Sequence, residues 1–199
     1  HNASTPQLGS GESATQIISN DIESFSFTDQ NLNFSQASDL IGAGDATGNN
    51  LLYGSIANDS MFGGGGNDTV FGFAGNDLIE GNTGDDNISG GSGDDTLSGS
   101  DGNDHLTLGT GSDLVGGGVG SDTITVDAAD AGDVNRIWAG GGNDTITGNI
   151  SVDYIYAGDG TDFVVSGGGD DFIYGGTSTG DTSDTIYGRE GNDFIDGGY

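Results

Sequence analysis

The stretch of sequence that decides the fold is residues 63–99, GGGGNDTVFGFAGNDLIEGNTGDDNISGGSGDDTLSG, which repeats with small changes every nine residues. In each unit, glycines lead to an Asp, and an aliphatic residue follows that Asp two positions later. A repeat of this kind is typical of solenoids, in which each unit buries its apolar side against its neighbours. The sequence therefore predicts a stack of similar short units.

The repeat continues far beyond this stretch. Sixteen units cover residues 45–196, fourteen of nine residues and two of thirteen, at 126–138 and 175–187. With the Asp numbered position six, position eight is Val, Ile, Leu or Met in all sixteen units, although these types make up only 34 of the 199 residues. A disordered Gly- and Asp-rich linker would not keep this phase, so we expect position eight to face a core.

Composition narrows the class of partner. The chain has 32 acidic residues and two basic ones, Arg136 and Arg189, which gives a formal charge of −30. Such a surface cannot neutralise phosphates, so we expect no nucleic-acid partner, and cations are favoured instead. No apolar run approaches the roughly 20 residues that a membrane span needs. The chain has no Cys and therefore no disulfide or thiol chemistry.

Each unit is too short to be stable alone. Three residues around position eight, such as Thr69, Val70 and Phe71, are predicted to form a short strand. The six residues before it are predicted to form a turn, where Gly permits positive φ angles. Stacked strands supply each other with a buried face and with hydrogen bonds, so a parallel solenoid of strands and turns is expected.

Stacking creates an electrostatic problem. The Asp side chains at position six arrive in columns about 5 Å apart, the spacing of strands. At that separation each pair of like charges repels by about 0.8 kcal/mol in bulk water, and by more near a protein. A divalent cation between turns removes the repulsion. Carboxylates and glycyl carbonyls form an all-oxygen set, which suits Ca²⁺ better than Zn²⁺ or Mg²⁺.

The units GGGGNDTVF and GGSGDDTLS fit the pattern GGxGxDxUx, so residues 45–196 resemble the RTX, or hemolysin-type calcium-binding, repeat family. The resemblance implies an all-β fold, a right-handed parallel β-roll (β-solenoid) that binds several Ca²⁺ ions along both flanks and is not an enzyme. Carried over to this chain, the metal ligands are Asp59, Asp68, Asp77, Asp86, Asp95, Asp104, Asp113, Asp122, Asp144, Asp153, Asp162, Asp171, Asp184 and Asp193.

Two departures from the pattern stand out. Position six is Asn135 in one unit, and the two thirteen-residue units place extra residues in their turns. We expect the flanks at 128–135 and 177–183 to bulge and to lack an ion.

The chain divides into two parts by its pattern. Residues 1–44 lack the repeat and are predicted to be an irregular tail with an apolar segment at 17–34, which serves as a cap or an assembly segment. Residues 45–199 are the predicted calcium-binding roll. After Asp196 the residues GGY begin another unit, so end-to-end self-association is expected if the chain stops there.

Outward positions carry a second pattern. If alternate units belong to the same sheet, Trp138, Tyr156 and Tyr174 follow one another on one face and form an aromatic strip. Two interpretations of this strip remain open. The rings stabilise the sheet by stacking on each other, or the strip docks a protein or a polysaccharide.

The favoured function is an extracellular calcium-binding structural module, secreted or on the cell surface of a bacterium, that folds when Ca²⁺ binds. One alternative is the tail of a secreted enzyme, toxin or adhesin whose active domain lies outside this sequence. Another is a glycan-binding module that uses the aromatic strip.

Overall fold

The computed structural model describes residues 47–127, 132–176 and 183–198. All regular structure in these ranges is β-strand, and none of it is a helix that could cross a membrane. The strands are β1 (Leu51–Tyr53), β2 (Ser60–Gly65), β3 (Thr69–Ala74), β4 (Leu78–Thr83), β5 (Asn87–Ser92), β6 (Thr96–Asp101), β7 (His105–Thr110), β8 (Leu114–Val119), β9 (Thr123–Thr125), β10 (Val134–Gly141), β11 (Thr145–Thr147), β12 (Val152–Asp159), β13 (Phe163–Gly168), β14 (Phe172–Tyr174), β15 (Thr185–Glu190) and β16 (Phe194–Asp196).

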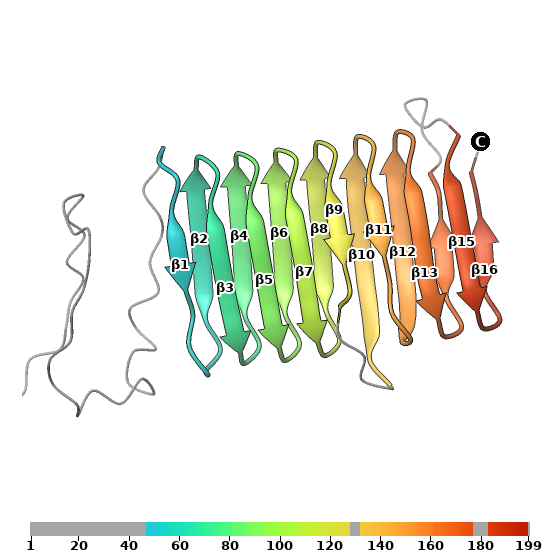
Figure 1. The fold of residues 1–199 in the computed structure, drawn as a ribbon, viewed down its shortest axis with the longest axis horizontal. Helices are drawn as coiled ribbons and strands as arrows, with labels where there is room; N and C mark the ends of the chain where they lie inside the picture. The colour runs from blue at the N-terminus through green and yellow to red at the C-terminus, as the bar shows by residue number, and fades with distance from the viewer. Residues whose placement is uncertain (1–46, 128–131, 177–182, 199) are drawn as a thin grey trace, which may run out of the picture. The chain divides into compact units, whose positions relative to one another are not determined.

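The strands form two eight-stranded parallel sheets (Figure 1). One sheet contains the odd-numbered strands in chain order and the other contains the even-numbered strands. Paired residues are usually 18 positions apart, as in Ile137 with Ile155, so two nine-residue units complete one coil. This confirms the prediction of an all-β parallel β-roll in which alternate units are neighbours.

The thirteen-residue units do not disturb the register of the sheets. Val115 pairs with Ile137 and Val164 pairs with Ile186, each 22 positions apart, so the four extra residues are accommodated outside the strands. Of the flanks predicted to bulge, 128–135 and 177–183, residues 128–131 and 177–182 lie outside the described residues, whereas Val134 and Asn135 belong to β10 and pair with β12. The predicted N-terminal tail, the cap segment and the domain boundary after residue 44 also lie outside the described residues.

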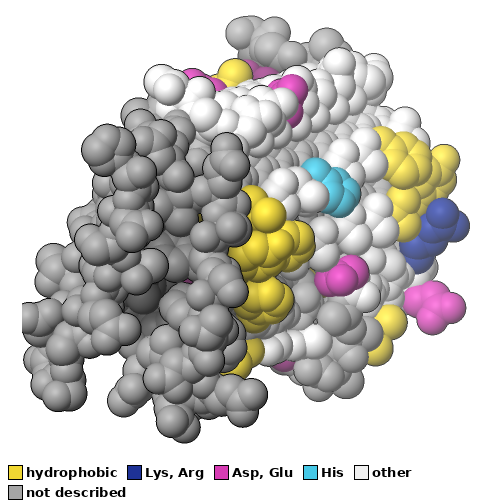
Figure 2. All heavy atoms as spheres, turned by 60° about the vertical axis from the view of Figure 1, so that its left-hand side comes forward, with side chains coloured by type: hydrophobic (Ala, Val, Ile, Leu, Met, Phe, Trp, Pro, Cys, Tyr) yellow, Lys and Arg dark blue, Asp and Glu magenta, His cyan; other side chains and the backbone are white. Residues whose placement is uncertain are grey.

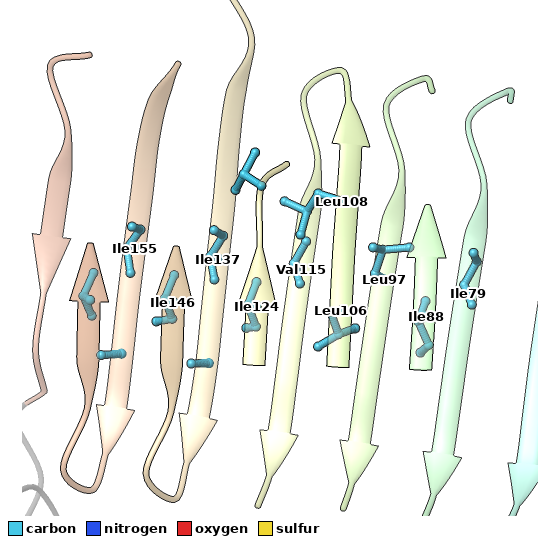
Figure 3. Close-up of a cluster of buried hydrophobic side chains, with 14 of the residues drawn as sticks. Ile79, Ile88, Leu97, Leu106, Leu108, Val115, Ile124, Ile137, Ile146 and Ile155 are labelled. Carbon is cyan, nitrogen blue, oxygen red and sulfur yellow. The ribbon is translucent and has the colours of Figure 1, made fainter. Parts of the chain in front are cut away.

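The core is a continuous cluster of aliphatic side chains between the two sheets (Figure 3). Figure 3 shows Ile88 and Ile146 of the odd sheet and Ile79, Ile137 and Ile155 of the even sheet in this cluster. Burial of each such side chain contributes about 1.5–3 kcal/mol. The buried residues at position eight are Met61, Val70, Ile79, Ile88, Leu97, Leu106, Val115, Ile124, Ile137, Ile146, Ile155, Val164 and Ile173. Further buried apolar residues lie at position one: Leu108, Val126, Ala139 and Ala157.

The prediction that position eight faces inward is confirmed, with an end effect. Leu52 and Ile186 are only partly buried, and Ile195 in β16 is 46% exposed. Each sheet ends at these strands within the described residues, so their side chains pack against a neighbouring coil on one side only.

The predicted three-residue strands are too short for most units. Strand β3, for example, continues from Thr69 through position three at Ala74, and Phe73 pairs with Gly91 of β5. Backbone groups of positions one to three therefore also pair with the next coil. Position two has a positive φ within these strands, which Gly adopts freely and Phe73 adopts with φ of 76°.

Candidate metal sites

Two columns of aspartates follow the turns at the two flanks of the roll. All fourteen predicted ligands lie in the described residues, and twelve of them are no more than 3% exposed. Asp184 and Asp193, in the last described coil, are partly buried. The odd column consists of Asp68, Asp86, Asp104, Asp122, Asp144, Asp162 and Asp184. The even column consists of Asp59, Asp77, Asp95, Asp113, Asp153, Asp171 and Asp193.

The first carboxylate oxygen of each aspartate ties neighbouring coils together. The backbone N–H of Asp59 donates to Oδ1 of Asp77 at 2.8 Å, and that of Asp68 donates to Oδ1 of Asp86 at 2.7 Å. The same bond recurs along both columns, reaching back from each carboxylate to the amide one coil earlier. Each carboxylate is therefore held in place by the backbone.

In ten of these aspartates the second oxygen, Oδ2, is left without a hydrogen bond. A buried carboxylate oxygen with nothing to accept from costs about 1–3 kcal/mol or more. A whole column of them exceeds the 5–15 kcal/mol or so that a folded domain has in reserve. This Oδ2 atom is buried and unpartnered in Asp68, Asp77, Asp86, Asp95, Asp104, Asp113, Asp122, Asp144, Asp153 and Asp171.

Burial also changes the acidity of the columns. Desolvation, together with the smaller effect of neighbouring carboxylates in each column, raises the pKa of Asp95, Asp104 and Asp144 from 3.8 to about 7. Desolvation likewise raises the pKa of Asp86 and Asp153 to about 6. These side chains resist being charged at neutral pH unless a proton or a cation accompanies them.

Where position one is glycine, the missing side chain leaves space beside Oδ2 of the aspartate in the same unit. A Cβ atom on Gly81 would collide with Oδ2 of Asp86 and would crowd the carbonyl oxygen of Gly99 in the next coil. A Cβ on Gly63 would meet Oδ2 of Asp68 in the same way. The absence of a side chain at position one thus leaves a small space that is bordered by a carboxylate oxygen and a peptide oxygen.

The donor set fits Ca²⁺. Within the described ranges no three acidic or His side chains converge on one point, so a cation here would draw on one or two carboxylates and on peptide carbonyls. Oxygen-only ligands of this mixture suit Ca²⁺, whereas Zn²⁺ prefers His and Cys. The chain has no Cys, and His105 lies exposed on the odd sheet.

A parallel β-solenoid with columns of buried aspartates on both flanks is the class of protein that these features define. The family model of the RTX calcium-binding nonapeptide repeat matches residues 46–70, 71–106, 89–124, 131–164, 148–179 and 178–199. The chain belongs to this family of calcium-binding repeat proteins. No curated protein matches the chain.

Asn135 occupies position six in the even column, where the neighbouring units have an aspartate. Its Oδ1 accepts the backbone N–H of Asp113 at 3.1 Å, as an aspartate would. Its Nδ2 donates to Oδ1 of Asp153 at 3.0 Å and to Oγ of Ser151 at 3.2 Å. An amide donor therefore takes the place of a charged carboxylate between Asp113 and Asp153 in the even column. That no ion binds at this part of the flank remains a prediction.

A second ladder of hydrogen bonds, at position five, was not predicted from the sequence. Here the backbone N–H donates back to the preceding coil, from Asn103 to Oδ1 of Asp85 and from Ser121 to Oδ1 of Asn103, both at 2.8 Å. These side chains are exposed. The sequence contains a signal for this ladder, because position five is Asn, Asp or Ser in most units. The ladder adds a second set of hydrogen bonds between coils, outside each aspartate column.

The predicted aromatic strip is contiguous on the outer face of the even sheet, and its rings stack on one another. Trp138 and Tyr156 have ring centroids 5.6 Å apart and planes 2° from parallel, and Tyr156 and Tyr174 are 4.9 Å apart at 7°. The neighbouring column, Tyr154 and Phe172, stacks at 4.8 Å. Most ring faces in the strip are therefore covered by other rings.

A second aromatic cluster lies on the odd sheet and was not predicted. Tyr53, Phe71 and Phe73 stack with ring centroids 5.5–6.2 Å apart, and Tyr53 and Phe73 are more than half exposed. Figure 2 shows hydrophobic side chains gathered at this end of the sheet that carries His105. The 18-residue spacing of Tyr53 and Phe71 was visible in the sequence, whereas the turn of Phe73 toward them depends on its positive φ.

Proposed function

We propose that the chain is an extracellular structural module of a bacterium whose folding is switched on by Ca²⁺. The observation that supports this most directly is the pair of columns of buried carboxylates, in which the Oδ2 atoms of the ten aspartates named above have no partner. The aspartates of both columns and the peptide oxygens of the turns would hold the ions, and Ca²⁺ would supply the positive charge that the chain lacks. The roll itself has no catalytic role in this proposal, and any enzyme, toxin or adhesin domain would lie outside this sequence.

Linkage gives the proposed switch its direction. A cation that binds the stacked turns but not the unfolded chain stabilises the folded state as its concentration rises. The typical affinity of extracellular calcium modules, with Kd of about 10⁻⁴–10⁻³ M, would leave the chain unfolded at low cytosolic calcium and folded outside the cell. Secretion before folding follows naturally from such a range.

The test is circular dichroism of the whole chain in chelator and then in rising Ca²⁺. We expect the strand signal to appear cooperatively with Ca²⁺ and to disappear again on chelation, with Mg²⁺ at the same concentration much less effective. A strand signal that chelation leaves unchanged would contradict the proposal.

We also propose end-to-end association of rolls. Supporting it, β15 and β16 are the last strands of their sheets within the described residues, and Phe194 and Ile195 of β16 are 49% and 46% exposed. An edge of parallel strands pairs readily with a further coil, supplied by more chain or by a second copy. In sedimentation with saturating Ca²⁺, we expect concentration-dependent association that Ile195→Asp weakens. Association that Ile195→Asp leaves unchanged, or its absence at every concentration, would contradict it.

A further inference from the structure

The outer face of the even sheet has one gap in its ladder of side chains. Gly116 of β8 pairs with Ser98 on one side and with Trp138 on the other, and all three occupy the outward position nine. A Cβ atom on Gly116 would meet nothing within 4 Å, and its φ is not positive. The position is therefore open because the side chain is missing, and the backbone there does not require glycine.

The gap exposes one face of Trp138. Tyr156 covers the other face of the indole, because their planes are 2° from parallel and their centroids are 5.6 Å apart along the stack of strands. On the side of β8 the neighbouring residue is Gly116, and no ring within the described residues stacks there. Trp138 is accordingly 43% exposed. The aromatic strip therefore begins with one uncovered face of the Trp138 indole, which is directed toward the gap at Gly116.

The rim of the gap is polar. Beyond Gly116, the hydroxyls of Ser98 and Ser100 lie 3.1 Å apart. Beside Trp138, Arg136 is exposed and its guanidinium lies 5.5 Å from the centre of the Tyr154 ring. Among the residues that the structure describes, no carboxylate forms an ion pair with Arg136, although the chain has a large excess of acidic residues. The hydroxyls of Ser98 and Ser100 thus border the gap on the side of β6, whereas the Arg136 guanidinium packs on Tyr154 of β12.

The size of the gap limits the occupant. Two strand spacings separate Ser98 from Trp138, about 9–10 Å. A group in van der Waals contact with the indole sits about 3.5–4 Å from it. The gap therefore accepts a single ring stacked parallel to the indole. A binding site of this kind combines apolar contact with a few placed polar groups.

We propose that the gap at Gly116 binds one sugar ring of a polysaccharide, stacked on the free face of Trp138. A pyranose ring has an apolar face of C–H groups and an edge of hydroxyls, which match the indole and the polar rim respectively. Elsewhere in the strip the rings cover each other, so this gap is where a sugar finds a free face. The site requires the calcium-folded roll and is independent of end-to-end association.

The chain contains a single tryptophan, so its fluorescence reports on this site alone. The experiment titrates the whole chain, in saturating Ca²⁺, with a neutral oligosaccharide (cellotetraose) and with an acidic one (tetragalacturonate), and follows the emission of Trp138. A saturable change with either probe is expected, and comparison of the two identifies a neutral or an acidic glycan as the source.

Gly116→Thr fills the gap with a residue that position nine accepts elsewhere, as at Thr107 and Thr125. It should keep the strand signal and lose the saturable change, whereas Ser89→Thr at position nine of the odd sheet should keep both. The proposal is overturned if neither probe gives a saturable change in a folded chain. It is also overturned if folded Gly116→Thr responds like the wild type, or if emission changes with protein concentration alone, which would mean that a second copy fills the gap.

Discussion

Single glycines in this chain are required for different reasons, and the structure separates them. Gly84 at position four has φ of 125°, and a Cβ there would collide with the carbonyl of Gly66 in the preceding coil. Gly116 has neither constraint. The same residue type is thus obligatory in a turn and dispensable on an outer face.

This contrast predicts opposite outcomes for one substitution. Gly84→Ala should lower the free energy of unfolding by about 1–3 kcal/mol, since it strains the backbone and separates two coils. Gly116→Ala should leave it unchanged or raise it by about 0.4–1 kcal/mol, because Ala restricts the unfolded chain. Urea unfolding in saturating Ca²⁺ measures both. Equal losses for the two variants would show that the turn geometry is misassigned.

Among the elements, the columns at position six hold the coils together, and Asn135 tests how they work. Asn135→Asp removes the donation to Asp153 and adds a like charge in a unit whose turn departs from the repeat. We expect it to lower the free energy of unfolding by about 1–3 kcal/mol in saturating Ca²⁺. The calcium midpoint of the strand signal should rise accordingly.

The matched control is Asn143→Asp at position five. Asn143 is exposed and accepts the backbone N–H of Thr161 at 2.9 Å, which an aspartate accepts equally well. This change should have an effect within about 0.5 kcal/mol. If Asn135→Asp instead stabilised the roll, an ion would have to occupy that part of the flank, contrary to the prediction that it lacks one.

The sequence predicted what the side chains specify and missed what the backbone specifies. Position eight and the buried aspartates were visible because their residue types repeat. The continuation of strands through positions one to three was not, since backbone pairing there tolerates Gly91 opposite Phe73 without any apolar pattern. The direction of the hydrogen bonds from position six likewise depends on how the coils are offset, which the period alone does not reveal.

At the scale of the whole molecule, the columns should make folding depend on pH as well as, by the proposal above, on Ca²⁺. Desolvation raises the pKa of Asp95, Asp104 and Asp144 to about 7 in the folded chain, against 3.8 when unperturbed. Without Ca²⁺, the folded chain therefore holds protons between about pH 7 and pH 4 that the unfolded chain has released. Lowering the pH favours the state that binds more protons, which here is the folded state. The free energy of unfolding therefore rises as the pH falls through this window.

Acid and Ca²⁺ should consequently act as competitors for the same oxygens. In chelator, lowering the pH from 7 to 5 should increase the strand signal and its resistance to urea, because protons neutralise the columns. Over the same change, the affinity of the folded chain for Ca²⁺ should fall, because the ligands must lose their protons to bind the ion. Circular dichroism in chelator at the two pH values measures the first effect, and the protons released per Ca²⁺ bound, from calorimetry in two buffers, measure the second. A calcium-free chain whose strand signal stays constant or falls between pH 7 and pH 5 would show that the buried carboxylates do not control folding.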